Sequence, residues 1–99
     1  MTDTNVDADS QASESSDEAA PTAEAVLLHL CRSIVAQPDA VSVETSRKSP
    51  DLVRFDVTVN QSDMGRVIGR RGRVATAIRT VVGAAGSKDG VGTEVEFVE

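Results

Sequence analysis

Aromatic side chains are nearly absent from this sequence, which has no Trp, no Tyr and two Phe among 99 residues. A hydrophobic core must therefore be built from aliphatic side chains, and a chain of this length supports one small domain. No apolar run approaches the roughly 20 residues that a membrane-spanning helix needs. The N-terminus also lacks the basic start and apolar stretch of a secretory signal. We therefore expect a cytoplasmic protein without a membrane segment.

Cysteine and histidine are each represented once, by Cys31 and His29. A single cysteine excludes an internal disulfide and fits a reducing compartment, and we expect Cys31 to be a small core residue. The two side chains stand two residues apart in a predicted helix, so they do not share a face, and further ligands for a metal are missing. No pair of nucleophile and base can be assembled from them. The sequence predicts no catalytic residue, no metal site and no cofactor.

Basic residues are missing from the first 21 positions, which carry six acidic ones. The remaining residues hold ten acidic and ten basic groups, so this segment accounts for the whole net charge of −6. It has few large apolar side chains and cannot bury enough surface to offset the entropy of ordering. We therefore expect a disordered acidic tail over residues 1–21 and a folded domain over residues 22–99.

Residues 23–36 have apolar side chains at helical spacing, namely Leu27, Leu30, Cys31 and Ile34. Thr22 is the predicted N-cap, and the proline that follows Gln37 disfavours helical geometry in that residue and stops the helix. Residues 41–45 and 53–59 then alternate between apolar and polar side chains. With a turn over residues 47–51, they predict a hairpin with one buried face.

A second helical region begins at residue 62, with Ser62 or Asp63 as its N-cap, and breaks at residues 69–72. We expect Gly83 and Gly86 to end the helix that follows, before a last alternating strand over residues 91–97. The predicted apolar face of that helix consists of Val74, Ala77, Ile78, Val81 and Val82. The order helix, strand, strand, helix, helix, strand predicts an α+β fold. Its three-stranded sheet has helices on one face and a right-handed crossover between the last two strands.

The segment Gly69-Arg70-Arg71-Gly72 combines features that suit a phosphate group. Glycine lets the backbone turn tightly and approach a bulky ligand without a Cβ in the way. The first amides of the following helix are unsatisfied and lie at the positive end of the helix dipole, which favours anions. Arg70 and Arg71 add charge and planar donor groups. The segment therefore predicts a clamp for a phosphodiester backbone, with a structural turn as the simpler alternative.

The stretch Val67-Ile68-Gly69-Arg70-Arg71-Gly72-Arg73, followed by Ala77-Ile78-Arg79, resembles the I-G-x-x-G core of KH domains. The GXXG loop of those domains clamps about four nucleotides of RNA backbone. The helix and two strands ahead of it are similar to the type II, prokaryotic order. Over roughly residues 25–98 the chain resembles the small stand-alone bacterial KH proteins, the KhpA or YlqC-type family. The acidic tail is a departure from that compact pattern.

The resemblance implies a non-catalytic protein that binds single-stranded RNA with little sequence preference, as an RNA chaperone or post-transcriptional regulator. Residues 69–72 would hold the RNA backbone. Val67 and Ile68 would form part of a base-contacting wall with Val74 and Val57, although the sequence does not decide which of the first two is buried. Two roles stay open for three further arginines, which either contact RNA or form solvated surface, namely Arg66, Arg73 and Arg79.

The resemblance also implies a dimer, either of two copies or with a larger KH protein of the Jag (EloR) type, in RNA regulation linked to cell elongation and division. The alternative function is a dimerisation or partner-docking module in which RNA contact is secondary. Its candidate surfaces are the first helix and the glycine-rich segment over residues 83–92. The acidic tail either serves as a solvated extension or competes with RNA for the arginines.

Overall fold

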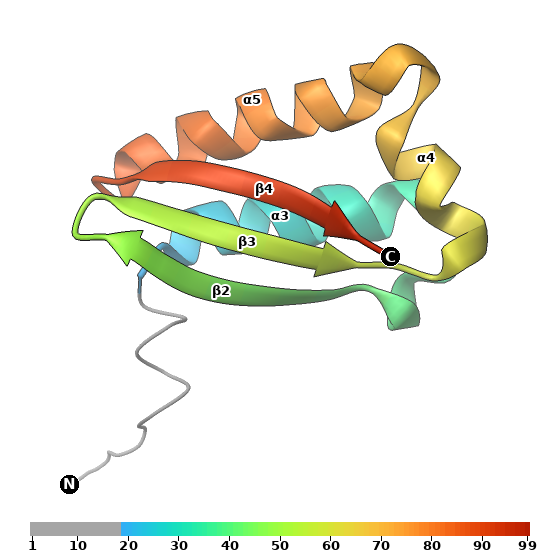
Figure 1. The fold of residues 1–99 in the computed structure, drawn as a ribbon, viewed down its shortest axis with the longest axis horizontal. Helices are drawn as coiled ribbons and strands as arrows, with labels where there is room; N and C mark the ends of the chain where they lie inside the picture. Colours follow the sequence, from blue (N-terminus) through green and yellow to red (C-terminus); the bar gives the residue numbers. More distant parts are fainter. Residues whose placement is uncertain (1–18) are drawn as a thin grey trace, which may run out of the picture.

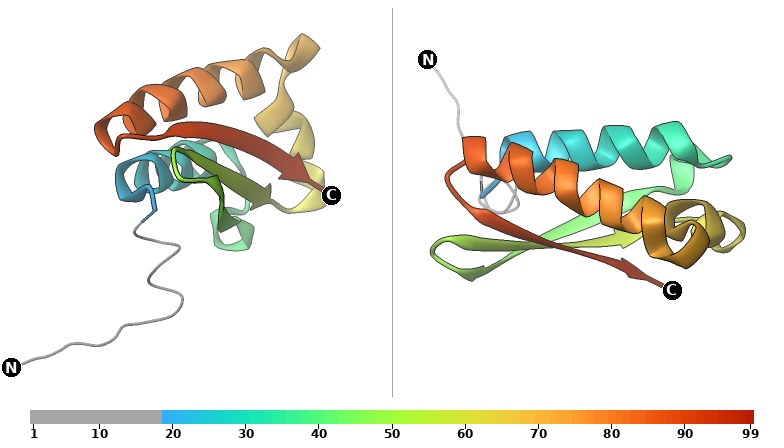
Figure 2. Two further views of the ribbon diagram at one scale, coloured as in Figure 1. Left: turned by 60° about the vertical axis from the view of Figure 1, so that its left-hand side comes forward. Right: turned by 90° about the horizontal axis from the view of Figure 1, so that it is seen from above.

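The helical and alternating segments of the sequence form the two layers of an α+β sandwich. The computed structural model describes residues 19–99, and the rest of the predicted tail lies outside them. The helices are α3 (Pro21–Ile34), α4 (Met64–Ile68) and α5 (Arg73–Lys88), and the strands are β2 (Ser42–Ser49), β3 (Leu52–Thr58) and β4 (Gly92–Val98). Figure 1 and the right-hand view of Figure 2 show the helices on one face of the sheet. Among the helices of the described residues, none is long and apolar enough to cross a membrane.

The sheet has the strand order β2-β3-β4 within the described residues. Strand β2 is antiparallel to β3, and β3 is parallel to β4 through a crossover that contains α4 and α5. This is the predicted topology, and it is confirmed. The hairpin turn is tighter than expected, because β2 continues to Ser49 and the register shifts between Arg47 and Ser49.

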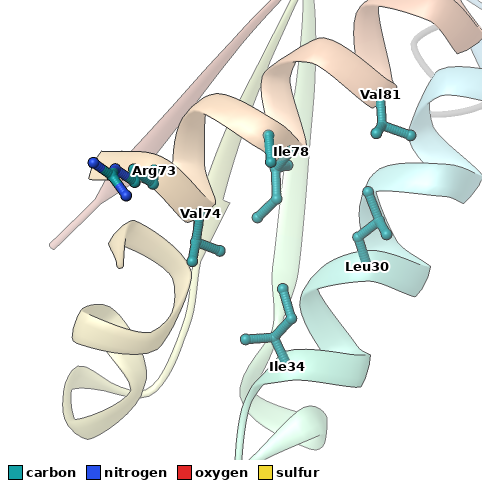
Figure 3. Close-up of a pocket in the computed structure, with 7 residues that line it drawn as sticks. Leu30, Ile34, Arg73, Val74, Ile78 and Val81 are labelled. Carbon is teal, nitrogen blue, oxygen red and sulfur yellow. The ribbon is translucent and has the colours of Figure 1, made fainter. Parts of the chain in front are cut away.

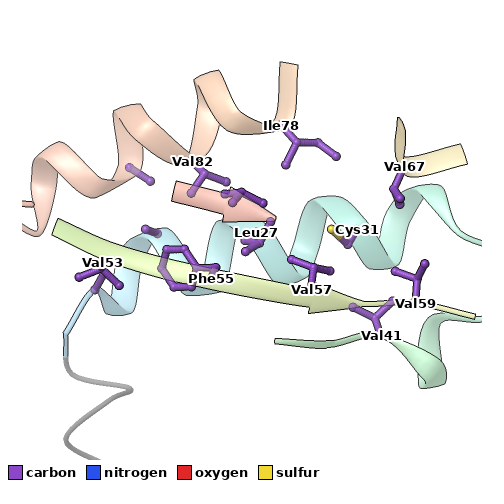
Figure 4. Packing of buried hydrophobic residues seen from close by; sticks show 14 of the residues in the cluster. Leu27, Cys31, Val41, Val53, Phe55, Val57, Val59, Val67, Ile78 and Val82 are labelled. Carbon is purple, nitrogen blue, oxygen red and sulfur yellow. The ribbon is translucent and has the colours of Figure 1, made fainter. Parts of the chain in front are cut away.

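The core lies between α3 and α5 on one side and the inner face of the sheet on the other (Figure 4). Phe55, with no exposed surface, packs in it beside Leu27 and Val82. Each such side chain contributes about 1.5–3 kcal/mol when fully buried. Cys31 has no exposed surface either, as expected for a small core residue. Burial raises the pKa of its thiol from the ordinary 9.0 to about 11.

The first helix begins earlier than the sequence suggested. Ala19 and Ala20 are buried against the core, and Pro21 is the first helical residue, so the predicted N-cap Thr22 lies inside the helix. The side chain that satisfies its first amides comes from the loop between α5 and β4. Asp89 accepts hydrogen bonds from the backbone N–H groups of Thr22, at 3.2 Å, and Ala23, at 3.0 Å. A local sequence motif cannot predict a cap that comes from a residue 66 positions away along the chain.

The prediction that Gly83 and Gly86 end the last helix is wrong, since α5 continues to Lys88. Gly86 is instead a point of close approach between α5 and β4. A Cβ at this position would lie 2.6 Å from Thr93 Cγ2 and 3.0 Å from the carbonyl oxygen of Val91. The missing side chain lets the helix pack directly on the strand, and tertiary packing overrides the low helix propensity of glycine.

Candidate nucleic-acid interface

Residues 69–72 form a loop of unusual backbone conformation between α4 and α5 (Figure 1). Gly69 has φ 74° and ψ 177°, a combination that is open essentially to glycine alone. Gly72 has φ 71° and ψ 15°, and Arg71, at φ 56° and ψ 27°, also occupies the left-handed region. A left-handed non-glycine residue is uncommon and costs about 1–2 kcal/mol. The loop is therefore strained at the arginine predicted to carry function.

The two glycines of the loop serve different purposes. A Cβ at Gly69 would lie 2.8 Å from Val74 Cβ and 2.9 Å from the Val74 backbone nitrogen, so this glycine is needed for the loop to close on α5. A Cβ at Gly72 would meet nothing within 4 Å. The backbone at Gly72 therefore borders open space, where a ligand can approach it.

The loop and the start of α5 carry exposed positive charge. Arg70, Arg71 and Arg73 are exposed, and among residues 19–99 none of them has an ion-pair partner. No side chain of the described residues caps the N-terminus of α5. Exposed guanidinium groups beside an uncapped helix N-terminus form a site with strong preference for anions.

The remaining predicted arginines make intramolecular contacts. Arg66 Nε lies 3.2 Å from Asp63 Oδ1, although 59% of the Arg66 side chain is exposed. Arg79 Nε donates a hydrogen bond of 3.0 Å to the carbonyl oxygen of Val95, on the open edge of β4, and its guanidinium lies 5.9 Å from the ring centre of Phe97. These contacts make Arg66 and Arg79 weaker candidates for RNA contact than the unpaired arginines of the loop.

The structure separates the apolar residues of the predicted base-contacting wall. Val67 and Val57 have no exposed surface and belong to the core, so their side chains are not open to a base (Figure 4). Ile68 and Val74 are half-buried and flank the loop on either side. The open choice between Val67 and Ile68 is thereby resolved, with Val67 buried and Ile68 partly exposed.

An apolar groove of about 300 Å³ runs beside the loop, between α3 and α5 (Figure 3). Leu30 and Ile34 of α3 face Val74, Ile78 and Val81 of α5 across it. Val81 is 46% exposed, which corrects the prediction that it lies on the buried face of α5. The buried side chains of α5 instead include Ala75 and Ala85.

The sequence predicted Leu30 and Ile34 as part of the apolar stripe of the first helix, itself a candidate docking surface, but not their position in a groove opposite α5. The signal that could have revealed it is the width of the apolar stripe on α3. Leu27 and Cys31 are buried, whereas Leu30 and Ile34 sit on the adjoining side and are only half-buried. A stripe that serves one buried face needs fewer apolar positions.

Asp63 was also missed, because it was predicted as an N-cap. Its side chain makes no capping bond to α4. The capping bond is found at the start of the preceding 3-10 turn, where Asn60 Oδ1 accepts a hydrogen bond of 3.0 Å from the backbone N–H of Ser62. Asp63 is 1% exposed and accepts hydrogen bonds from the backbone N–H groups of Ala36 and Gln37, each at 3.0 Å. It therefore joins α4 to the end of α3.

Within residues 19–99 no group of three or more His, Cys, Asp or Glu side chains is arranged to hold a metal ion. The chemistry that the loop offers is binding of an anion by backbone amides and guanidinium groups. Together with the sheet and its order of elements, a GXXG loop between consecutive helices defines a type II KH domain.

Comparison with known proteins identifies the family within the type II KH domains to which the chain belongs. The family described as KhpA/KhpB, KH domain, matches residues 24–97, and the chain belongs to that family. It is 45% identical over 76 residues to the RNA-binding protein KhpA of Streptomyces coelicolor, covering 77% of this chain and 91% of the relative. It is 37% identical over 76 residues to the RNA-binding protein KhpA of Listeria monocytogenes, covering 77% of this chain and 99% of the relative.

A solved structure shares the fold at much lower sequence identity. Era of Aquifex aeolicus, bound to GDP and aluminium fluoride, matches with a TM-score of 0.59 and 12% identity. The match covers 76% of this chain and 29% of the Era chain. The likeness concerns the fold alone.

Proposed function

We propose that this chain is a non-catalytic RNA-binding protein that clamps single-stranded RNA through residues 69–72, as an RNA chaperone or post-transcriptional regulator in the cytoplasm. The observation that supports this most strongly is the exposed pair Arg70 and Arg71, unpaired within residues 19–99, beside the uncapped N-terminus of α5. The relatives named RNA-binding protein KhpA agree with it. The described residues hold one histidine and one cysteine, and the cysteine is buried, which supports binding without catalysis.

The ligand of the clamp is the phosphodiester backbone, and the bases contribute through apolar contact. Ile68 and Val74 are the half-buried apolar side chains next to the loop. The absence of Trp and Tyr from the sequence removes the usual stacking partners of bases. We therefore expect weak sequence preference and an affinity that falls as the salt concentration rises.

The test is binding of a labelled single-stranded RNA as a function of salt, for the native chain and for Arg70→Asp/Arg71→Asp. Each phosphate contact to a single strand contributes about −0.7 to the slope of log affinity against log salt, so losing two contacts reduces the slope by about 1.4. We expect an affinity loss of at least about tenfold at low salt.

A matched control carries the same change of charge at the hairpin, far from the loop. Arg47→Asp/Lys48→Asp changes two exposed residues near the β2–β3 turn. Circular dichroism checks that both variants fold. The clamp is wrong if the loop variant binds as the native chain does, or if the hairpin variant loses as much affinity.

The apolar groove between α3 and α5 supports a second candidate function, the docking of another protein. We propose that it is covered by a second copy of the chain or by a larger KH protein of the Jag type. Val81 is 46% exposed on a groove whose lining is almost entirely apolar, and such surfaces favour protein contacts.

This proposal is tested by the oligomeric state of Val81→Asp, measured by sedimentation. Thr80→Asp is the control, since Thr80 is exposed on the neighbouring position of α5 and receives the same charge. We expect Val81→Asp alone to weaken self-association by more than about tenfold, with RNA binding per folded molecule retained. A native chain that is monomeric at all concentrations directs the test to the Jag-type partner, and a groove that binds neither rejects it.

A further inference from the structure

Asp63 is a buried carboxylate directly before α4. Helix α4 and the loop of residues 69–72 that follows it are together called the arm. Asp63 is 1% exposed, and its two oxygens accept hydrogen bonds of 3.0 Å from the backbone N–H groups of Ala36 and Gln37. Arg66 Nε lies 3.2 Å from Oδ1 and balances its charge. A buried charge is tolerated only when it is paired and hydrogen-bonded, and Asp63 meets both conditions.

The arm has two kinds of contact that hold it. Helix α4 spans five residues, too few for a helix to be stable by itself. Val67 is its fully buried side chain, and Met64 and Ile68 are half-buried against the core. The orientation of the arm therefore depends on this apolar packing and on the polar link from Asp63 to the end of α3.

We propose that Asp63 is a positioning residue of the RNA clamp: by tying the start of α4 to Ala36 and Gln37, it sets the orientation of residues 69–72. The inference rests on the proposed RNA-binding function and adds to it a residue that does not contact RNA. Preorganisation of a binding loop raises affinity because less freedom is lost on binding. A looser arm is therefore expected to bind RNA more weakly.

The other end of α3 supplies a matched control. Asp89 accepts hydrogen bonds from the backbone N–H groups of Thr22 and Ala23, at 3.2 and 3.0 Å. Its contact is of the same chemical type as that of Asp63, but it lies at the start of α3, away from α4 and the loop (Figure 1). A loss of general stability is common to both sites, whereas positioning of the clamp belongs to Asp63 alone.

The test compares Asp63→Asn with Asp89→Asn in the full chain. In each variant an amide NH₂ faces a backbone N–H, so one of the two hydrogen bonds is lost. RNA affinity is measured at a temperature where circular dichroism shows both variants folded. We expect Asp63→Asn to bind about 5- to 10-fold more weakly, and Asp89→Asn to bind as the native chain does.

The direction of the change in RNA affinity distinguishes positioning of the loop from a simple electrostatic effect. Asp63→Asn removes a negative charge near an anion site and releases Arg66, and by charge alone it would bind RNA more tightly. Affinity that is unchanged or increased in a folded Asp63→Asn therefore overturns the proposal. An equal loss in both variants also overturns it, because that result indicates a general effect on the fold.

A second measurement does not depend on RNA, and its main comparison uses the native chain alone. In the native chain, amide hydrogen exchange at Ala36 and Gln37 is compared with exchange at residues 69–72. The proposal expects the protected amides of the two segments to open together, and Asp63→Asn to speed exchange at 69–72 more than tenfold. Independent opening rejects the link, whereas a native chain that shows common opening but binds no RNA rejects the proposed function instead.

Discussion

At the scale of single residues, backbone strain and the proposed RNA contact fall at the same position of the loop. Arg71 is held in the left-handed region at φ 56°, while the neighbouring Gly72 occupies that region at little cost. Strained residues persist at binding sites where the surrounding structure imposes the conformation. In this loop the guanidinium of Arg71 contributes to the proposed RNA site, and its backbone lowers the stability of the fold.

The first prediction is that Arg71→Gly makes the protein more stable and a weaker RNA binder. Relief of the left-handed strain exceeds the added entropy of glycine in the unfolded chain, for a net gain of about 0.5–1 kcal/mol. Urea unfolding measures the stability and a labelled RNA measures the affinity. Arg71→Ala is the comparison, since it removes the same charge and keeps the strain. Equal stability of the two variants would contradict the argument.

The second prediction concerns Cys31, whose pKa burial raises to about 11. Above pH 9.0 the unfolded chain loses the thiol proton while the folded chain keeps it, so unfolding is favoured as the pH rises from about 9 to about 11. The free energy of unfolding falls by about 1.4 kcal/mol per pH unit from this group. Urea unfolding between pH 8 and pH 10.5 should show a decrease about 2 kcal/mol larger for the native chain than for Cys31→Ala. Parallel pH profiles would refute it.

At the scale of elements, the outer face of the sheet carries a row of like charges. The register places Glu44 opposite Asp56 and Asp56 opposite Glu96, across all three strands of the described sheet. Arg54 Nε donates a hydrogen bond of 3.0 Å to Asp56 Oδ1, and this bond and the charge of Asp56 raise the pKa of Arg54. Glu94 lies opposite Arg54. The face therefore contains both repulsive and attractive cross-strand pairs.

The third prediction uses two exposed positions of β4 with different cross-strand neighbours. Both Glu94 and Glu96 interact favourably with Arg54, and Glu96 also lies opposite Asp56. Glu96→Lys replaces repulsion from Asp56 by attraction, a gain of about 0.5 kcal/mol, but it also replaces the attraction to Arg54 by repulsion. Glu94→Lys changes the net charge equally and has no such gain, so it should destabilise the fold more than Glu96→Lys. Urea unfolding at low salt measures both, and about 1 M salt should bring them together. Equal changes in both variants would show that net charge, and not register, decides.

At the scale of the whole molecule, the excess of negative charge lies entirely in the N-terminal segment of the sequence. The first 18 residues carry six acidic and no basic groups, and the later residues are balanced. The described part of the chain begins at Ala19, at the start of α3, and α3 is about 21 Å long. A segment of 18 residues can span up to about 60 Å, so its length does not prevent contact with the arginines of the loop.

The fourth prediction is that removing residues 2–18 raises RNA affinity about threefold at low salt, through the loss of negative charge near the site. The effect should disappear at about 0.5 M salt, where charges separated by more than a few ångströms are screened. The control keeps the length and replaces the six acidic residues by Asn and Gln. It should bind as the shortened chain does, and a control that binds like the native chain would reject competition by charge.

Much of the fold could be predicted because its signals are local. The alternation of Val53, Phe55 and Val57 follows from the side-chain period of a strand, and the parallel pairing of β4 follows from its helical crossover. The GXXG segment was visible for the same reason, since its glycines and arginines are contiguous. Errors fell at the ends of helices and at exposed apolar positions such as Val81.

The sequence by itself determined the class of fold, the α+β order of its elements and the position of the GXXG loop, because periodicity, glycine and charge act over a few residues. Only the tertiary structure decided that Val67 is core, that Leu30 and Ile34 border a groove, and that α5 continues past Gly86. It also decided the partners of Asp63 and Asp89, which lie 26 to 67 residues away along the chain. Such contacts depend on how the helices pack, and packing is a property of the assembled fold.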